Sequence, residues 1–281
     1  MNYRHAYHAG NFADCMKHAL FARILHYLKQ KEAPFRVIDT HAGIGLYDLN
    51  SVEAGKTLEW QAGIAHLAEP LSDAAEALLV PYREALAEVA TRFGGAFYPG
   101  SPMLAKLILR RQDRAIFVEK HPADVRVLEE RLGRDRRLKV LELDGWTALK
   151  ANIPPVERRG VVLIDPPFEV GGELAHMARA MVEAQRKWNN GIIVGWYPIK
   201  DLAETEQLAD ILRAAGVPKI LRLEMLIDAA DDPSRLNGSG LVIINPPWTL
   251  AGEAEILLPA MAERLARCDQ AGYRCDWLAG E

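Results

Sequence analysis

Apolar positions near the start of the chain recur at helical spacing. Asn11 and Asp14 are typical of the first turn of a helix, with Asn11 as its N-cap. Four apolar side chains then recur every four residues: Met16, Leu20, Ile24 and Leu28. This spacing predicts one helix with a single apolar stripe that Pro34 ends. The apolar run Phe35–Asp39 follows as a short strand, which leads into a turn at residues 40–45 that contains glycine.

Residues 46–100 interrupt the alternation that this strand begins. They include two helical patterns, at about Trp60–Glu69 and Asp73–Phe93. Ser101-Pro102 then predicts a new helix, with the serine as N-cap and the proline in the first turn. The pattern therefore divides the chain into a domain formed by residues 1–45 and 101–281 and an inserted helical subdomain, 46–100.

Beyond residue 114 short apolar runs alternate with helical patterns. Together with the first strand, six of these runs predict a sheet of seven strands: Ala115–Glu119, Lys139–Leu143, Val161–Ile164, Gly191–Trp196, Lys219–Leu226 and Leu241–Ile244. Such alternation is typical of an α/β fold whose mostly parallel sheet is covered on both faces. Residues 228–240, between the last two strands, are turn-like and contain no helix. The seventh strand is therefore expected to be antiparallel.

Composition narrows the class of protein. The chain has 281 residues, of which 49% are hydrophobic and 26% charged, and both values are near the average for globular proteins. No apolar run reaches the ~18 residues of a membrane span. The three cysteines are widely spaced and form no C-x-x-C pair, so we expect reduced thiols and a cytosolic protein.

Charge is unevenly distributed along the chain. The formal net charge is −4, yet residues 1–36 carry six Lys or Arg against two Asp or Glu. This asymmetry favours a contact with a polyanion near the N-terminus. Further basic clusters occur at Arg110–Arg111, Arg134–Arg137, Arg158–Arg159 and Arg186–Lys187. Each pair taken alone is most simply interpreted as a solvated helix end or turn.

Three candidate ligand contacts follow the first three strands of the predicted parallel sheet. Asp39-Thr-His-Ala-Gly43-Ile-Gly45 provides glycines that let the backbone approach a ligand. The full dinucleotide pattern G-x-G-x-x-G is absent, which disfavours a nicotinamide-dependent dehydrogenase. Glu119 ends the second strand, where an acidic side chain can hold a ribose diol. Asp144-Gly145 ends the third, where a carboxylate can accept a hydrogen bond from an exocyclic amine, although Asp-Gly is also a common turn.

The strongest chemical signal is Asp165-Pro-Pro-Phe168, which ends the fourth strand. Two successive prolines fix φ and remove two N–H donors, so the loop is rigid and its carbonyls are free to accept. The carboxylate of Asp165 and the carbonyl of Pro166 can both accept hydrogen bonds from one amino group, and Phe168 offers a flat face for a base. Two acceptors favour a pyramidal nitrogen whose lone pair is available. This is the signature of S-adenosylmethionine-dependent amino methyltransferases.

Asn245-Pro-Pro-Trp248 is a competing copy of the same pattern. In open α/β sheets ligands bind at the carboxyl ends of the parallel strands. Asp165 ends such a strand, whereas Asn245 ends a strand expected to be antiparallel and should face the opposite rim. We therefore expect Asp165 to be catalytic and Asn245 to form a structural turn.

A string of motifs resembles one family across essentially the whole chain, the bacterial 23S ribosomal RNA adenine-N6 methyltransferases of the RlmJ type. The motifs occur in this order: Tyr3-Arg-His-Ala-Tyr-His-Ala-Gly-Asn11, Asp14, Lys17-His18, Asp39-Thr-His-Ala-Gly43-Ile-Gly45, Tyr98-Pro-Gly-Ser-Pro102, Asp144-Gly145, Leu163-Ile-Asp-Pro-Pro167, Trp196-Tyr-Pro198 and Asn245-Pro-Pro-Trp248. One departure is Phe168, where tyrosine is common in the family; the ring is kept and the hydroxyl is lost.

The resemblance implies a class I methyltransferase fold and particular residue roles. Positions that contact S-adenosylmethionine would be His18, His41, Ser101, Glu119, Asp144, Gly145 and Asp165, and Asp165 would also be catalytic. Tyr3 would lie beside the substrate adenine, and residues 46–100 would match a small helical subdomain. Family members act as monomers on one adenine of 23S ribosomal RNA and prefer RNA that is not fully assembled.

These observations combine into a mechanism to be tested. The adenine N6 would be bound by Asp165 and Pro166, with the base stacked near Phe168, while Tyr3 and Lys17 would orient the base and the phosphates. His5, in the same basic segment, is a further candidate RNA contact. A zinc site at His5, His8, Cys15 and His18 is disfavoured because their spacing matches no common zinc pattern.

Three alternatives remain open at this stage. A DNA adenine methyltransferase would share the same loop. A protein-amide or guanine-N2 methyltransferase also fits a Pro-Pro loop in general. An RNA-binding assembly factor could keep the fold and lose turnover, although Asp39, Glu119, Asp144 and Asp165 are all present.

Overall fold

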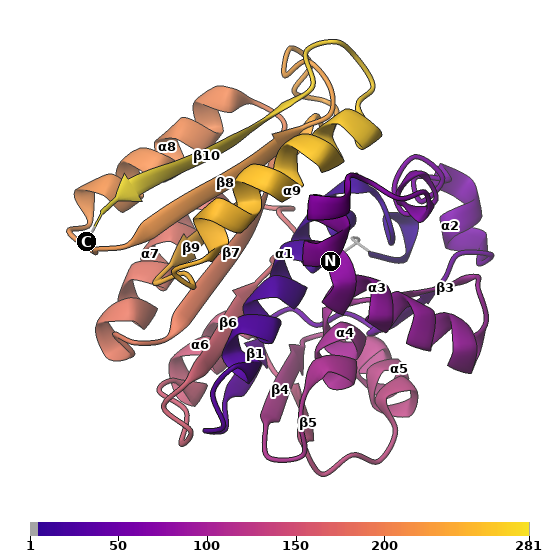
Figure 1. Cartoon of the computed structure of the whole chain (residues 1–281). Coiled ribbons are helices and arrows are strands. Elements are labelled where there is room, and N and C mark those ends of the chain that lie inside the picture. Colours follow the sequence, from indigo (N-terminus) through magenta and orange to yellow (C-terminus); the bar gives the residue numbers. More distant parts are fainter. Residues whose placement is uncertain (1–4, 281) are drawn as a thin grey trace.

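The computed structural model describes residues 5–280, in which eight strands form one sheet in the order β10-β8-β9-β7-β6-β1-β4-β5 (Figure 1). Five neighbouring strands are parallel: β7 (Ile192–Ile199), β6 (Gly160–Ile164), β1 (Arg36–Asp39), β4 (Arg114–Glu119) and β5 (Leu138–Glu142). The central ones are apolar along their length because both faces of the sheet are covered.

The remaining three strands add an antiparallel part to the same sheet. They are β9 (Gly238–Ile244), β8 (Ile220–Leu226) and β10 (Gly272–Ala279). β9 runs antiparallel to both β7 and β8, which confirms the expected direction of that strand. The predicted count of seven strands was wrong by one, because β10 pairs antiparallel with β8 at the sheet edge. Its Arg274 and Asp276 interrupt the apolar run, so the sequence conceals the strand; across the pairing, Asp276 accepts from Arg222 at 2.8 Å.

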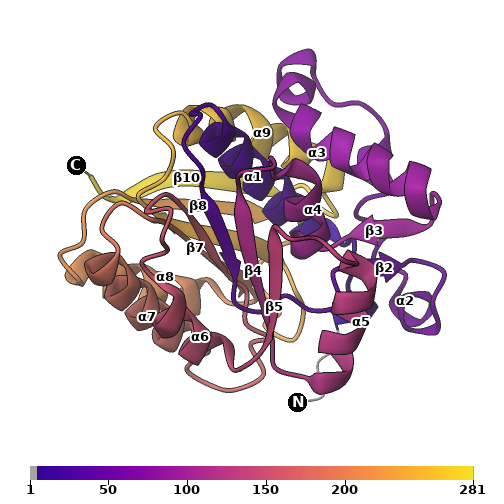
Figure 2. The same ribbon diagram turned by 90° about the horizontal axis from the view of Figure 1, so that it is seen from below.

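Helices cover the sheet in two layers (Figure 2). One layer contains α6 (Gly145–Asn152), α7 (Glu173–Lys187) and α8 (Leu202–Ala214), whose apolar side chains form one core with the sheet. The other core includes α1 (Phe12–Lys29), α3 (Asp73–Phe93), α4 (Ser101–Ile108), α5 (Pro122–Leu132) and α9 (Leu250–Leu265). This is the doubly covered α/β architecture that the alternating pattern predicts.

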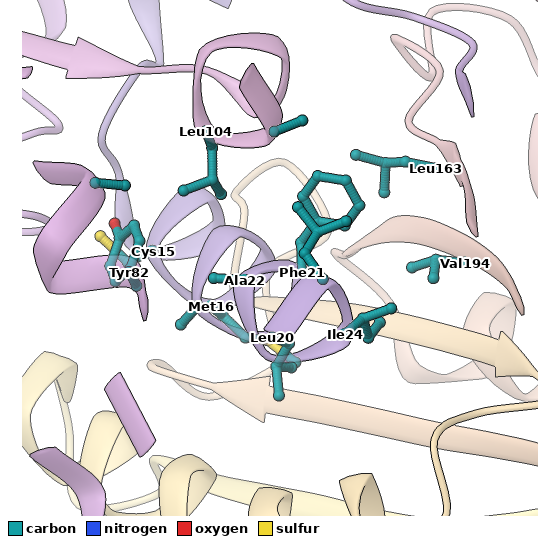
Figure 3. Packing of buried hydrophobic residues seen from close by; sticks show 14 of the residues in the cluster. Cys15, Met16, Leu20, Phe21, Ala22, Ile24, Tyr82, Leu104, Leu163 and Val194 are labelled. Carbon is teal, nitrogen blue, oxygen red and sulfur yellow. The ribbon is translucent and has the colours of Figure 1, made fainter. Parts of the chain in front are cut away.

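Helix α1 is the central element of the second layer (Figure 3). Asn11 caps it as predicted, since its side chain accepts a hydrogen bond from the Asp14 N–H at 3.0 Å. The helix contacts α3, α4 and α9 on its flanks and β9 and β6 beneath it. Met16, Leu20 and Phe21 are buried as a result. A helix enclosed in this way is held by packing more than by its own propensity.

The segment 46–100 contains more than helices. Strands β2 (Leu46–Asp48) and β3 (Phe97–Pro99) pair with each other, and between them lie α2 (Val52–Thr57) and α3. The helix expected at about Trp60–Glu69 is wrong: residues there form turns and a single turn of 3-10 helix, His66–Ala68. A second 3-10 turn, His5–Tyr7, precedes α1. The apolar side of α3 joins the main core, and the division into a separate subdomain stays a prediction.

Two further observations complete the description of the fold. Ser101 is the first residue of α4 and not its N-cap, which is Gly100, so the predicted capping role was wrong. Its hydroxyl points instead toward the end of β1 and bonds to Asp39. Within residues 5–280, no helix is both long and apolar enough to cross a membrane.

Replacing Leu20 with alanine should destabilise the protein strongly. Leu20 is fully buried among α1, the sheet and neighbouring helices, so the truncation leaves a cavity that costs about 2–5 kcal/mol. Urea unfolding measures the change in the free energy of unfolding. His26→Ala, an exposed position on the same helix, is the matched control and should change it by less than about 0.5 kcal/mol. Equal effects of the two substitutions would contradict the central position of α1.

Candidate active site

A pocket of about 270 Å³ opens at the carboxyl ends of the parallel strands. Its lining comes from the loops that follow β1, β4, β5 and β6, and from α1. Eleven of the residues singled out in the sequence line it: His5, Lys17, His18, His41, Gly43, Ser101, Glu119, Asp144, Gly145, Asp165 and Pro166. The structure therefore brings together residues that are up to 161 positions apart in the chain.

Asp39 lies beneath this pocket and not on its surface. Its side chain is fully buried, and it accepts hydrogen bonds from the Ser101 hydroxyl at 2.7 Å and from the His41 N–H at 3.2 Å. Burial raises the pKa of Asp39 to about 7, and the bond from Ser101 opposes that rise. Asp39 thus ties the end of β1 to the start of α4, and it fixes the turn that follows.

The glycine turn after β1 meets Glu119 at the end of β4. The Gly43 N–H donates to the Glu119 carboxylate at 3.0 Å, and the His121 N–H donates to its other oxygen at 2.8 Å. Gly43 has a φ of 59°, and a Cβ there would lie 2.5 Å from the Tyr47 hydroxyl. Only glycine suits this position, both for its backbone conformation and for the space available.

Asp144 and Gly145 form the wall contributed by β5. Asp144 caps α6, accepting from the Thr147 N–H at 3.1 Å, and Lys120 lies 3.2 Å away. Burial opposes its ionisation, but the Thr147 N–H and Lys120 prevail and lower the pKa of Asp144. A Cβ on Gly145 would lie 2.3 Å from the Thr40 carbonyl oxygen, so the two strand-end loops touch because this residue is glycine.

His41 is held against the same wall. Its Nδ1 lies 2.8 Å from the Thr40 hydroxyl, and its ring packs edge-on against Trp146. Burial lowers the pKa of His41 to about 4, so the imidazole is neutral near pH 7. Trp146 was not singled out in the sequence; its only signal there is its place directly after Gly145.

His18 is buried on the side of the pocket that α1 forms. Its Nδ1 lies 2.8 Å from the Tyr98 hydroxyl, which in turn lies 2.9 Å from the hydroxyl of Tyr82 on α3. Burial lowers the pKa of His18 to about 3. The imidazole is therefore a neutral partner in a buried hydrogen-bonded chain that links α1 to the segment 46–100.

A buried chain of charges ends at Asp165. The Lys17 ammonium group lies 2.6 Å from Asp165 and 2.9 Å from Asp14, and only 3% of Lys17 is exposed. Burial alone would lower the pKa of Lys17, but the two carboxylates outweigh it and the net effect raises the pKa. Asp14 also accepts from His5 at 2.9 Å, and although burial opposes its charge, His5 and Lys17 hold its pKa well below the usual range.

This geometry points to a second role for Lys17, beside the RNA contact that stays a prediction. Its ammonium group is enclosed between two carboxylates and lies 5.2 Å from the centre of the Trp196 ring. Its contacts fit a residue that positions Asp165. Asp14 was noted in the sequence only as a first-turn acid, although its i,i+3 spacing from Lys17 was a usable signal.

The loop Asp165-Pro-Pro-Phe168 separates the first pocket from a second one of about 430 Å³. His5, Lys17 and Asp165 line both, while Phe168 and Trp196 line only the second. The rings of Phe168 and Trp196 meet edge-on, with centroids 5.7 Å apart. Phe168 has a φ of 51°, which is unusual for a residue with a side chain and is typical of functional loops.

Two further candidates do not line either pocket among the described residues. Tyr3 lies outside the described residues, so its placement beside a substrate stays a prediction. Asn245 ends β9, which runs antiparallel to β7, so its Pro-Pro loop lies at the opposite end of the sheet from Asp165. There its N–H donates to the Lys219 carbonyl at 2.8 Å, as a structural turn would.

The histidines and cysteine considered for zinc have separate partners. His5 bonds to Asp14, His18 bonds to Tyr98, and the Cys15 thiol lies 3.7 Å from the Gly10 carbonyl oxygen. Among residues 5–280, no group of three or more His, Cys, Asp or Glu side chains is arranged to hold a metal ion.

Comparisons with known proteins agree on one family. A family model described as "RsmJ: Ribosomal RNA large subunit methyltransferase D, RlmJ" matches residues 32–279. The chain is 35% identical to ribosomal RNA large subunit methyltransferase J of Escherichia coli and 36% identical to that of Haemophilus influenzae, over 100% of each chain. The crystal structure of protein LPL1258 from Legionella pneumophila is 32% identical, with a TM-score of 0.85 over 96% of this chain and 98% of that one.

Acid should destabilise the fold through His18. Its pKa is 6.5 in model peptides and about 3 in the folded protein, so between these values the unfolded chain binds a proton that the folded one does not. Stability is therefore lost as the pH falls below 6.5, by at most about 1.4 kcal/mol per pH unit.

The variant His18→Gln isolates this effect, because glutamine keeps a hydrogen-bonding group for Tyr98 and does not titrate. Urea unfolding at pH 7 and pH 4.5 should show that wild type loses about 2–3 kcal/mol more than the variant over this interval. His41 also lowers the stability as the pH falls, whereas Asp39 raises it. Both groups titrate alike in wild type and variant, so the difference between the two proteins removes their contributions. Parallel pH profiles for the two proteins would show that His18 is not buried in its neutral form.

Proposed function

The chain belongs to the RlmJ family of ribosomal RNA large subunit methyltransferases, and from that membership we propose that Asp165 directs methyl transfer from S-adenosylmethionine to N6 of one adenine in 23S ribosomal RNA. The observation that carries this proposal is the position of Asp165. Its carboxylate lies where the two pockets meet, and a buried lysine holds it there. One pocket suits the methyl donor and the other suits the base that receives the methyl group.

The first pocket fits S-adenosylmethionine by shape and by its polar groups. Gly43 and Gly145 leave space that a Cβ would fill, and both lie on the pocket wall. Glu119, fixed by two backbone N–H groups, is suited to a ribose diol. Asp144 is suited to an adenine amino group, and His18, His41 and Ser101 complete the proposed set. When bound, S-adenosylmethionine supplies an electrophilic methyl group.

Asp165 and Pro166 prepare the acceptor amine. An adenine amino group is a weak nucleophile because its lone pair is delocalised into the ring. The Asp165 carboxylate and the Pro166 carbonyl each accept a hydrogen bond from one of its two N–H groups. This arrangement favours a pyramidal nitrogen with an available lone pair. Lys17 keeps the Asp165 carboxylate in one orientation, so the hydrogen-bond acceptor is organised before the base arrives.

Proton transfer is completed by the same carboxylate. N6 would form a bond to the methyl carbon as the bond from that carbon to the donor sulfur breaks, with S-adenosylhomocysteine as the leaving group, and N6 would give up one of its two protons. That proton becomes acidic only as the N–C bond forms, so Asp165 need not be a strong base beforehand. The hydrogen bond to Asp165 places a carboxylate oxygen where the proton is released.

The second pocket provides the surface for the base. The adenine leaves its stack at a cost of a few kcal/mol, less where the RNA is unpaired. Phe168 and Trp196 line this pocket, and a stacked base gains about 1–3 kcal/mol from such a ring. His5 lines both pockets, and this position makes it a further candidate contact to the RNA. Its bond to Asp14 fixes the ring there.

The family favours ribosomal RNA over the alternatives, which are duplex DNA, a protein amide, a guanine amine and a binding role without turnover. Asp39, Glu119, Asp144 and Asp165 are present and positioned, which favours an active enzyme over an inactive assembly factor. We further propose that the enzyme acts as a monomer in the cytoplasm on naked or partly assembled RNA.

Asp165→Ala should abolish methylation and leave binding of the cofactor almost unchanged. Removing the carboxylate leaves the N6 amine without its main acceptor, so turnover should fall by on the order of 10²–10³-fold or more. The assay digests 23S RNA to nucleosides after reaction with labelled S-adenosylmethionine and measures N6-methyladenosine. Asn245→Ala, in the second Pro-Pro loop, is the matched control and should keep activity. Near-normal turnover in Asp165→Ala would overturn the assignment.

Gly145→Ala should impair binding of the cofactor. The added Cβ meets the Thr40 carbonyl oxygen at 2.3 Å, so two strand-end loops have to separate at the pocket wall. We expect at least a tenfold loss of affinity for S-adenosylhomocysteine by calorimetry. Gly252→Ala, where a Cβ meets nothing within 4 Å, should bind as wild type does. Unchanged affinity in Gly145→Ala would place the cofactor elsewhere.

A further inference from the structure

The end of the sheet opposite to the active site gathers basic residues from distant parts of the chain. Five segments precede the five parallel strands: 186–187 before β7, 157–159 before β6, 29–36 before β1, 110–114 before β4 and 134–137 before β5. Because these strands are neighbours and run in one direction, the segments lie side by side along the lower edge of the molecule in Figure 1. We call this edge the basic rim.

The basic rim holds a large local excess of positive charge. Its five segments contain thirteen Lys or Arg against four Asp or Glu, in a chain whose formal net charge is −4. In the sequence, each basic pair was interpreted as an isolated helix end or turn. The order of the strands in the sheet brings these pairs together. Half of the six cations expected to mark a polyanion contact near the N-terminus also lie here, since Lys29, Lys31 and Arg36 belong to the rim and not to the pocket.

Some rim arginines have a structural role. Arg110 donates to the carbonyls of Lys29 and Lys31, Arg137 donates to the carbonyls of Lys106 and Leu109, and Arg159 donates to those of Leu28 and Ala33. These contacts cap the carboxyl ends of α1 and α4, where positive charge is favourable. Burial lowers the pKa of Arg159, and the nearby Arg110 lowers it further, which shows how closely the cations are crowded.

The remaining cations need another explanation. The side chains of Arg111, Arg134 and Arg158 are exposed, and within residues 5–280 they form no ion pair. The four acidic residues of the rim offset only part of its charge and leave an excess of nine positive charges. Such an excess on one edge favours binding of an external polyanion.

An exposed aromatic side chain lies at the same end of the sheet. Because β9 is antiparallel, its Asn245-Pro-Pro-Trp248 loop emerges at the rim. Asn245 bonds to the Lys219 carbonyl and, at 3.4 Å, to that of Gly191, which follows the segment 186–187. Trp248 is 81% exposed there. A large exposed indole at the same end of the sheet as exposed cations is typical of a surface that binds unpaired nucleotides.

We propose that the basic rim is a second RNA-binding surface, which holds the phosphate backbone of a segment remote from the methylated adenine while Trp248 stacks on an unpaired base. Five strands at 4.7–4.9 Å spacing give a surface about 19 Å wide, enough for several phosphates. Because the rim lies across the molecule from Asp165, one RNA segment in the active site cannot also reach it directly. That the bound RNA is ribosomal RNA rests on the proposed function. That the rim binds RNA rests on the charge and the exposed tryptophan of the rim and does not depend on the proposed function.

The test compares Arg111→Gln/Arg158→Gln with Arg126→Gln/Arg179→Gln, which removes the same charge from exposed positions on α5 and α7. Fluorescence anisotropy measures the affinity for naked 23S RNA across a salt series. The rim variant should bind about tenfold more weakly or worse at 0.1 M salt, with a slope of log K against log salt shallower by about 1.5, while the control matches wild type. Trp248→Ala should lose about five- to a hundredfold, and Trp248→Phe should recover most of it.

Methylation separates this proposal from the proposed function. On full-length 23S RNA the rim variant should show a raised KM with kcat unchanged, and on a short fragment carrying the methylated adenine it should match wild type. The proposal is overturned if the rim variant and the control variant bind RNA with the same affinity at every salt concentration. It is also overturned if the wild-type rim binds anionic vesicles and does not bind RNA. If the wild-type protein methylates no RNA and the rim variant still binds RNA more weakly than wild type, the proposed function is wrong and the proposal that the rim binds RNA is supported.

Discussion

One buried interaction connects the active site to the rest of the fold: the ammonium group of Lys17 between the carboxylates of Asp14 and Asp165. Removing Lys17 would leave two carboxylates without their shared cation, at a cost of about 3–5 kcal/mol. The pairing therefore requires α1 to lie at one height on the sheet, since Lys17 has to reach the loop after β6. The burial of α1 under α3, α4 and α9 fixes that height. Packing far from the pocket thus determines where the reactive carboxylate lies.

The sequence predicted the features that depend on local chemistry and strand order. The parallel sheet, the reversed direction of β9 and the cap of α1 were all found as expected. The residues that line the first pocket also came together, because strand-end loops meet wherever parallel strands are neighbours. Asp165 and Asn245 could be told apart for the same reason, since strand direction alone sends their loops to opposite ends of the sheet.

What the sequence concealed depends on contacts between distant residues. Strand β10 was missed because its charged side chains are paired with residues far away in the sequence, such as Arg222 on β8 and Glu206 on α8. Lys17 was predicted as a phosphate contact, and its pairing with two carboxylates was not foreseen. Residues near Trp60 have the composition of a helix, yet they form turns; the N–H of Ile64 there bonds to the carbonyl of Gly10, just before α1. Tertiary contacts override local preference in each case.

The two ends of the sheet divide the work of an RNA-modifying enzyme. Chemistry is concentrated at the carboxyl ends of the strands, whereas the amino ends carry unpaired positive charge and an exposed tryptophan.

The central claim concerns methyl transfer at the carboxyl ends of the strands. In the most direct test, the purified wild-type protein is incubated with labelled S-adenosylmethionine and, separately, with each of four acceptors. The acceptors are naked 23S RNA, naked 16S RNA, assembled large subunits and duplex DNA, all from cells that lack the enzyme. The account predicts N6-methyladenosine in naked 23S RNA alone. Label in duplex DNA, or in a nucleoside other than N6-methyladenosine, would contradict it.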